Sequence, residues 1–224
     1  MAIVVAPKRA ADIVAGYSPD LITVPCDSSF PDPNIAIELL ESADALVLGC
    51  GVTRTPESHT ALLDIIQRCK TPMVLDAEAL HALATNALSI KGKQALLTPN
   101  AGEYQVLSGR SWPQTAEAQR TAAKALAKQY DATVIVKGAP DIVSDGERTY
   151  VDPRGSPYMT KGGYGDLLAG VAGAHLARGR TPFDAARMAA FIVGRAGELA
   201  SAKFGESTLA SDVLTYLSAV IHSR

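Results

Sequence analysis

Short apolar runs alternate along the chain with segments whose apolar residues recur every three or four positions. The apolar runs are rich in β-branched residues and lie at 3–5, 21–24, 45–48, 73–75, 95–97 and 132–138. The periodic segments predict helices at 9–17, from Asn34 as a cap, from Pro56, and at 78–85, 101–107, 114–129, 164–177, 182–200 and 209–222. Strands that are apolar throughout and separated by helices are typical of a parallel sheet covered on both faces.

Residues 142–144 and 149–151 flank Asp145-Gly146, a pair suited to a tight turn. This segment predicts a β-hairpin that adds antiparallel strands to the sheet. The chain has 224 residues and shows no repeat or linker, so residues 1–224 are predicted to form a single domain. The pattern as a whole predicts an α/β fold with a mostly parallel central sheet.

Several polar residues and glycines directly follow the predicted strands. Ligands of such sheets bind beyond the carboxyl ends of the strands. The segment 49–51, Asp76, the segment 98–103 and Lys137-Gly138 occupy these positions, which favours a shared site. Each also has a structural explanation. Gly51 suits a turn, Asp76 suits the cap position of a helix, and Asn100 with Glu103 suits a capping box.

The segment 161–170 combines Gly162, Gly163 and Gly165 with a single carboxylate, Asp166, ahead of a small-residue helix. Glycines before a helix expose backbone N–H groups at the positive end of the helix dipole, which suits an anion such as phosphate. Asp166 then takes a proton from a group that attacks the phosphate, or holds a metal. The structural alternative is that Asp166 only caps the helix.

Composition and charge exclude some partners. The chain is 47% hydrophobic and 20% charged, with a net charge of −2, so it has no general attraction for nucleic acid or anionic membranes. No apolar run approaches the roughly 18 residues needed to span a bilayer. Three cysteines and four histidines lack metal-ligand spacing, so we expect no metal ligands among them. An odd number of cysteines favours a reducing compartment, and we predict a cytoplasmic protein.

Four motifs in order resemble one known family. Segment 74–80 (VLDAEAL) is similar to its Val-Leu-Asp-Ala-Asp-Ala-Leu, and 97–103 (LTPNAGE) to its Leu-Thr-Pro-His-x-Gly-Glu. Segment 136–139 (VKGA) resembles its Val-Lys-Gly, and 162–170 (GGYGDLLAG) its Gly-Gly-Thr-Gly-Asp-Val-Leu-Ala-Gly. By these motifs the chain resembles the ADP-dependent NAD(P)H-hydrate dehydratases of the ribokinase-like superfamily. The resemblance implies a ribokinase-like three-layer sandwich.

The resemblance also implies an activity, ligands and residue roles. The family removes water from hydrated NADH or NADPH with ADP or ATP and Mg²⁺, and it tends to form homo-oligomers. Asp166 would be the catalytic base. The nucleotide would contact Lys137, Gly138, Ala139, Pro140, Asp141, Gly162, Gly163 and Gly165. The hydrate would contact Gly51, Asp76, Asn100, Glu103 and Asp166. Two alternatives stay open: a small-molecule kinase that phosphorylates another hydroxyl, and a nucleotide-binding relative without turnover.

The sequence departs from the family motifs mainly on the substrate side. Segment 49–53 (GCGVT) replaces Gly-Pro-Gly-Leu-Gly, Asn100 replaces His, Asp141 replaces Thr, and Tyr164 replaces Thr. The strand and helix that usually precede segment 3–5 are missing, so we expect a shortened N-terminus. The resulting open sheet edge favours self-association.

Overall fold

The computed structural model describes residues 1–86 and 90–222. Its central feature is a six-stranded sheet in the order β3-β4-β5-β6-β7-β8. The strands β3 to β6 run parallel, and β7 and β8 add two antiparallel neighbours. The sheet strands are β3 (Leu46–Leu48), β4 (Met73–Leu75), β5 (Ala95–Leu97), β6 (Thr133–Val136), β7 (Asp141–Ser144) and β8 (Thr149–Asp152). The hairpin predicted at Asp145-Gly146 is therefore confirmed.

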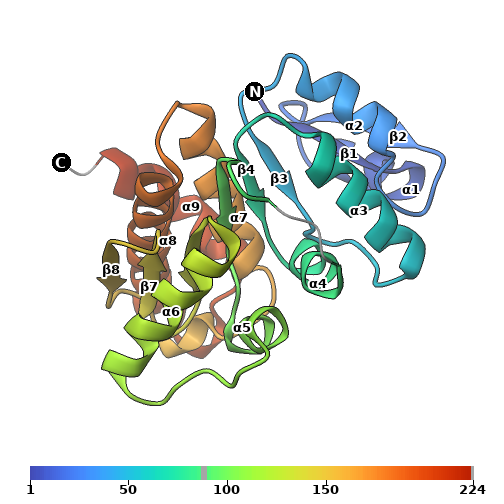
Figure 1. Cartoon of the computed structure of the whole chain (residues 1–224). Coiled ribbons are helices and arrows are strands. Elements are labelled where there is room, and N and C mark those ends of the chain that lie inside the picture. Colours follow the sequence, from blue (N-terminus) through green and yellow to red (C-terminus); the bar gives the residue numbers. More distant parts are fainter. Residues whose placement is uncertain (87–89, 223–224) are drawn as a thin grey trace.

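Helices cover both faces of this sheet (Figure 1). They are α3 (Pro56–Arg68), α4 (Glu78–Thr85), α5 (Ala101–Ser108) and α6 (Ala116–Tyr130) on one face, and α7 (Tyr164–Ala177) and α8 (Pro182–Phe204) on the other. Side-chain alternation along each strand explains the two layers. In β4, Met73 and Leu75 pack with the first group of helices, whereas Val74 packs with α7 and α8. The predicted three-layer sandwich is confirmed.

The first part of the chain forms a smaller unit beside this sheet (Figure 1). It contains β1 (Ile3–Pro7), α1 (Lys8–Ala15), β2 (Ile22–Cys26) and α2 (Pro33–Leu40). The first two apolar runs were expected in the same sheet as the others, but β1 and β2 make a separate parallel pair within the described residues. Pro25 lies inside β2 and has no N–H to donate, which suits an edge strand.

Two further findings concern the helices. Asp32 caps α2, not Asn34 as predicted, because the Asp32 Oδ1 accepts hydrogen bonds from the N–H groups of Asn34 and Ile35 while Pro33 occupies the first turn. Helix α9 (Ala210–His222) packs on α8, and short 3₁₀ turns lie at Pro157–Met159 and Gly205–Ser207. Among the described residues, no helix is both long and apolar enough to cross a membrane. The single domain stays a prediction.

Candidate active site

A buried carboxylate, Asp76, lies at the carboxyl end of β4, and side chains from the neighbouring strand ends converge on it. Asp76 is 2% exposed. Its Oδ1 accepts a hydrogen bond of 2.6 Å from the Thr98 hydroxyl after β5 and one of 2.7 Å from the Lys137 Nζ after β6. A buried charge needs a partner and hydrogen bonds, and this arrangement supplies both.

Asp76 is not a helix cap. The cap position of α4 is Ala77, which has a φ of 46° and makes no side-chain capping bond. The backbone turns sharply at Ala77 and leaves the Asp76 side chain at the carboxyl ends of the strands, in contact with Thr98 and Lys137. The capping alternative for Asp76 is therefore wrong, and side chains that follow β4, β5 and β6 do meet at the ends of these strands. A shared ligand site there stays a prediction.

For Asn100 and Glu103 the structural alternative holds. The Asn100 Oδ1 accepts a hydrogen bond of 2.9 Å from the Glu103 N–H, and the Glu103 Oε2 accepts one of 2.7 Å from the Asn100 N–H. This capping box begins α5. Glu103 also lies 3.6 Å from the Lys137 Nζ, so it joins the charge network around Asp76. A contact of either residue with substrate stays a prediction.

The segment after β6 turns back on itself through a hydrogen bond between its own residues. The Asp141 Oδ1 accepts a hydrogen bond of 2.8 Å from the Gly138 N–H, and the intervening Ala139–Pro140 peptide bond is cis. Burial raises the pKa of Asp141 to about 6, with a further contribution from the Asp152 carboxylate, while the Gly138 N–H and the Lys137 ammonium oppose the shift. Asp141 is therefore more readily protonated than an ordinary aspartate.

The glycine segment before α7 forms an open turn. Gly163 is the cap residue of α7 and has a φ of 93°, a conformation that favours glycine. A methyl group on Gly165 would lie 3.1 Å from the Lys137 Nζ and 3.6 Å from the Asp76 Oδ2, so this turn lies against the Asp76 cluster. The bulky Tyr164 side chain is buried and its hydroxyl donates to the Thr208 carbonyl, so its bulk packs with α8 and α9.

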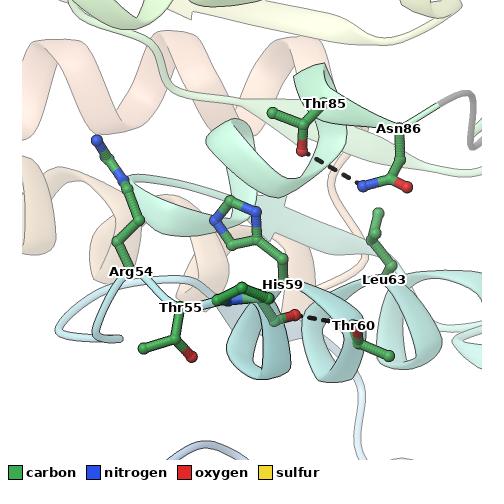
Figure 2. A pocket seen from close by; sticks show the side chains of 8 residues that line it. Arg54, Thr55, His59, Thr60, Leu63, Thr85 and Asn86 are labelled. Carbon is green, nitrogen blue, oxygen red and sulfur yellow. Dashed lines mark hydrogen bonds between the residues drawn. The ribbon is translucent and has the colours of Figure 1, made fainter.

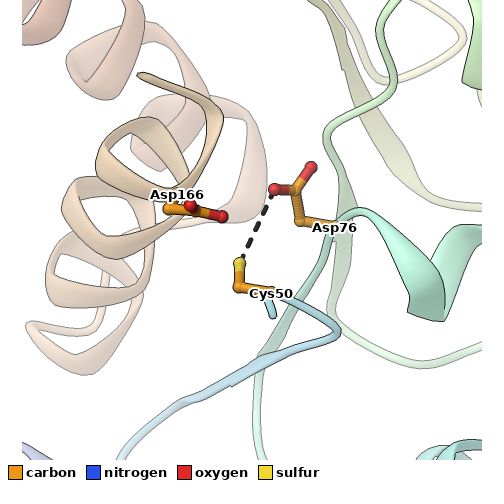
Figure 3. A group of neighbouring side chains, drawn as sticks. All are labelled: Cys50, Asp76 and Asp166. Atoms are coloured by element: carbon orange, nitrogen blue, oxygen red, sulfur yellow. Dashed lines mark hydrogen bonds between the residues drawn. The ribbon is translucent and has the colours of Figure 1, made fainter. Parts of the chain in front are cut away.

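Asp166 lies in the first turn of α7 and is exposed. The cap position belongs to Gly163, so the interpretation of Asp166 as the cap residue is wrong. Figure 3 shows Asp166 close to Asp76 and Cys50. One ligand atom from each of the three side chains lies within 4.8 Å of the others. Two carboxylates and a thiol thus meet beyond the carboxyl ends of β3 and β4, beside the first turn of α7.

Cys50 and Thr98 lie in the segments 49–51 and 98–103 that were expected at the site, but the sequence-based prediction assigned neither residue a contact with nucleotide or substrate. The Cys50 Sγ lies 3.6 Å from the Asp76 Oδ2 and donates a hydrogen bond to it. Burial raises the pKa of the Cys50 thiol, and the charges of Asp76 and Asp166 raise it further. The position of Cys50 between two glycines directly after a strand was the available signal, but a free cysteine more often indicates a buried apolar side chain.

A second polar cluster borders the turn that follows β3. The Arg54 Nε lies 2.9 Å from the Glu78 Oε1 and 3.0 Å from its Oε2, and the His59 Nε2 lies 2.5 Å from Oε1. Burial alone would raise the pKa of Glu78, but the hydrogen bonds from Arg54 and His59 outweigh it and hold the pKa below its usual value.

Arg54 and His59 also line a surface hollow of about 430 Å³ (Figure 2). Its other lining residues are Thr55, Pro56, Thr60, Leu63, Thr85 and Asn86. Within the part of the chain that the structure describes, none of the predicted site residues lines this hollow. The predicted site residues therefore gather around Asp76 and not in the hollow.

Comparisons with known proteins found similar sequences and a similar fold. The sequence profile described as NAD(P)H-hydrate dehydratase matches residues 1–219. The chain is 34% identical over 227 residues to the bifunctional NAD(P)H-hydrate repair enzyme Nnr of Pyrobaculum aerophilum, covering 99% of this chain and 44% of that protein. It is 35% identical over 224 residues to the ADP-dependent (S)-NAD(P)H-hydrate dehydratase of Cenarchaeum symbiosum, covering 96% of this chain and 76% of that protein.

A solved structure shows the same fold. The ADP/ATP-dependent NAD(P)H-hydrate dehydratase of Bacillus subtilis, co-crystallised with ATP and Mg²⁺, superposes with a TM-score of 0.81 at 20% identity. The match covers 98% of this chain and 77% of the Bacillus chain. The chain therefore spans less than half of the bifunctional Pyrobaculum relative and about three quarters of the single-function Cenarchaeum and Bacillus relatives.

Proposed function

Because the chain belongs to the NAD(P)H-hydrate dehydratase family, we propose that it removes water from hydrated NADH or NADPH with ADP or ATP as phosphate donor. The observation that carries this proposal is the position of Asp166. It is an exposed carboxylate in the first turn of α7, beside an open glycine turn and within reach of the Asp76 cluster.

Asp166 acts as the base in this proposal. Its carboxylate accepts the proton of the ring hydroxyl while the hydroxyl oxygen attacks the terminal phosphorus of the nucleotide. The bond from that phosphorus to the bridging oxygen breaks, and the nucleotide leaves one phosphate shorter. The phosphorylated ring then expels inorganic phosphate and loses the proton from its neighbouring carbon. The nicotinamide double bond is thereby restored.

The glycine turn and Lys137 stabilise the negative charge of the transferred group. The N–H groups at the beginning of α7 lie at the positive end of its dipole. The Lys137 ammonium lies beside Gly165, so a phosphate in the turn would have a positive charge nearby. Phosphoryl transfer needs little more from a protein than positioning, charge neutralisation and one proton acceptor.

Mg²⁺ would enter with the nucleotide, and the site fits this ion. Mg²⁺ prefers oxygen ligands, and both Asp166 and the Asp76 Oδ2 are carboxylate oxygens that neither Thr98 nor Lys137 uses among the described contacts. The Asp76 Oδ2 would hold the ion or its water ligands, where it would neutralise phosphate charge, and Asp166 would stay free to accept the proton. We expect the nucleotide to supply most of the remaining ligands.

A turnover assay with hydrated NADH tests the proposal. We expect NADH absorbance to recover when ADP or ATP is added with Mg²⁺, and the two nucleotides assayed separately identify the donor. Asp166→Asn should lower turnover by about 10²- to 10⁴-fold while leaving nucleotide binding unchanged by thermal shift. No recovery with either nucleotide would refute the dehydratase, and unchanged turnover in the variant would refute Asp166 as the base.

We further propose that the protein is cytoplasmic and self-associates. Its free, largely buried cysteines suit a reducing compartment. Ile3 and Ile22 pair across β1 and β2 and are 40% and 43% exposed, which supports burial of this small sheet against a second copy. A monomer in analytical ultracentrifugation would exclude the self-association.

A further inference from the structure

We propose that Cys50, Asp76 and Asp166 form a binding site for one soft divalent cation of the Zn²⁺ or Cd²⁺ type. The three residues come from different segments: the turn after β3, the end of β4 and the first turn of α7 (Figure 3). Each offers one ligand atom, and these atoms lie within 4.8 Å of one another. The fold thus gathers three donors that are far apart in the sequence.

The separations suit tetrahedral coordination. Zn²⁺ binds sulphur at about 2.3 Å and carboxylate oxygen at about 2.1 Å, so a tetrahedral site places sulphur and oxygen about 3.6 Å apart. The Cys50 Sγ and the Asp76 Oδ2 are 3.6 Å apart. Asp166 is exposed and provides the third ligand with little rearrangement. The fourth position opens to solvent, where water can complete the coordination.

Neighbouring side chains prepare Asp76 for this role. Thr98 and Lys137 both contact its Oδ1, and these contacts fix the orientation of the carboxylate. Its Oδ2 accepts the hydrogen bond from Cys50. Charges also balance. A dication and the Lys137 ammonium would together offset two carboxylates and one thiolate, and the thiol proton would pass to solvent when the cation binds.

Sulphur sets the metal preference of this site. Thiolate ligands select Zn²⁺ and related soft ions, whereas Mg²⁺ takes oxygen ligands. Cys50 supplies the only sulphur among the three ligand atoms of this cluster. A bound soft cation would occupy the carboxylate of Asp166 and stop its proton transfer. This consequence, unlike the binding itself, rests on the proposed function.

Titration of the full chain with Cd²⁺, without nucleotide or substrate, tests the site. We expect an ultraviolet thiolate-to-cadmium charge-transfer band that saturates at one equivalent. Cys50→Ser should abolish the band, and Asp166→Asn should keep it but weaken binding at least tenfold. Cys69→Ser is the matched control, because Cys69 is 1% exposed and hydrogen-bonds the Thr71 carbonyl away from the site. Circular dichroism of each variant verifies the fold.

Two results would overturn the inference: no band in the unmodified chain, or a band that persists in Cys50→Ser. The inhibitory consequence needs a second measurement. Zn²⁺ should lower turnover of the unmodified chain and of Cys69→Ser at concentrations that leave Cys50→Ser at its own metal-free rate. The cadmium band is read without turnover, so failure of the dehydratase proposal and failure of the metal site remain distinguishable.

Discussion

Two glycine turns lie beside the same carboxylates, and they use glycine for different reasons. The first turn, residues 49–51, follows β3, and the second, residues 162–165, leads into the first turn of α7. Gly49 has a φ of 112°, and a methyl group there would lie 2.0 Å from the Asp76 carbonyl oxygen. A methyl group on Gly162 would meet nothing within 4 Å among the described residues.

The comparison separates a packing turn from a binding turn. In the first, glycine lets the backbone pass close to Asp76 and so carries the Cys50 sulphur to the carboxylates. In the second, glycine leaves space beside exposed N–H groups, which is where a phosphate would fit. Glycine-rich sequence is thus the same signal for two roles, and the surroundings decide between them.

The two turns are also anchored differently. Arg54, in the chain after the first turn, forms an ion pair with Glu78, whose side chain is 8% exposed. Lys161 ties the second turn to the 3₁₀ segment ahead of α9, since its Nζ donates to the carbonyls of Glu206 and Thr208. The first anchor depends on a titratable carboxylate, whereas the second depends on backbone carbonyls that do not titrate.

The largest effect is expected from a substitution that disrupts the first turn. Gly49→Ala forces a positive φ on alanine and a collision with the Asp76 carbonyl and Ala79, so we expect a loss of about 3 kcal/mol or more in the free energy of unfolding. Gly51→Ala is the control, because Gly51 also has a positive φ, of 70°, but open space around it. It should cost about 1 kcal/mol. Urea unfolding measures both, and equal losses would contradict the packing role of Gly49.

A smaller effect tests the second turn. Gly165→Ala would place a methyl group beside the Lys137 Nζ, inside the space that a phosphate would use. We expect nucleotide affinity to fall about tenfold or more, as for the loss of a hydrogen bond to a charged group, with little change in stability. Calorimetric titration with ADP and ATP measures the affinity.

Gly170→Ala is the control, since Gly170 lies farther along α7 and an added methyl group there meets nothing within 4 Å among the described residues. It should bind the nucleotide nearly as well as the unmodified chain. If both alanine variants bind with unchanged affinity, the second turn does not hold the phosphate.

Sequence periodicity predicted the elements that lie in the core. The bounds of β4, β5, α4 and α7 match the prediction, because these segments are apolar on the faces that the sheet and its helices bury. The separate pairing of β1 and β2 was missed, since an apolar run looks the same whichever sheet it joins. Asp32 was overlooked as a cap although Pro33 follows it, a strong sign of a first helical turn.

The candidate site was predicted in part, for a similar reason. Residues directly after strands were expected to converge, and Asp76 does meet Lys137, 61 positions away. The sequence does not show which of two roles each polar side chain takes. Asn100 and Glu103 pair with each other in a local capping box, whereas Cys50 reaches Asp76 across 26 positions. Contacts between residues close in the sequence can be predicted from their spacing, whereas contacts between distant residues are seen only in the folded structure.

A third expected effect concerns the titratable anchor of the first turn. Glu78→Gln removes the charge that accepts hydrogen bonds from Arg54 and His59, so we expect a loss of about 2 kcal/mol in stability at pH 7. The folded pKa of Glu78 is lowered, so its charge stabilises the fold at pH values above the unfolded pKa of about 4.3. That contribution disappears as the pH falls through the folded pKa.

Urea unfolding from pH 7 down to pH 3 measures this difference. The stabilities of the unmodified chain and Glu78→Gln should converge toward the acid end. Glu57→Gln provides the control, because Glu57 is an exposed acid in the first turn of α3 and its loss should change stability by less than about 0.5 kcal/mol. A gap between Glu78→Gln and the unmodified chain that stays constant with pH would mean that packing, and not charge, anchors the first turn. The two glycine turns would then not differ in their dependence on a titratable group.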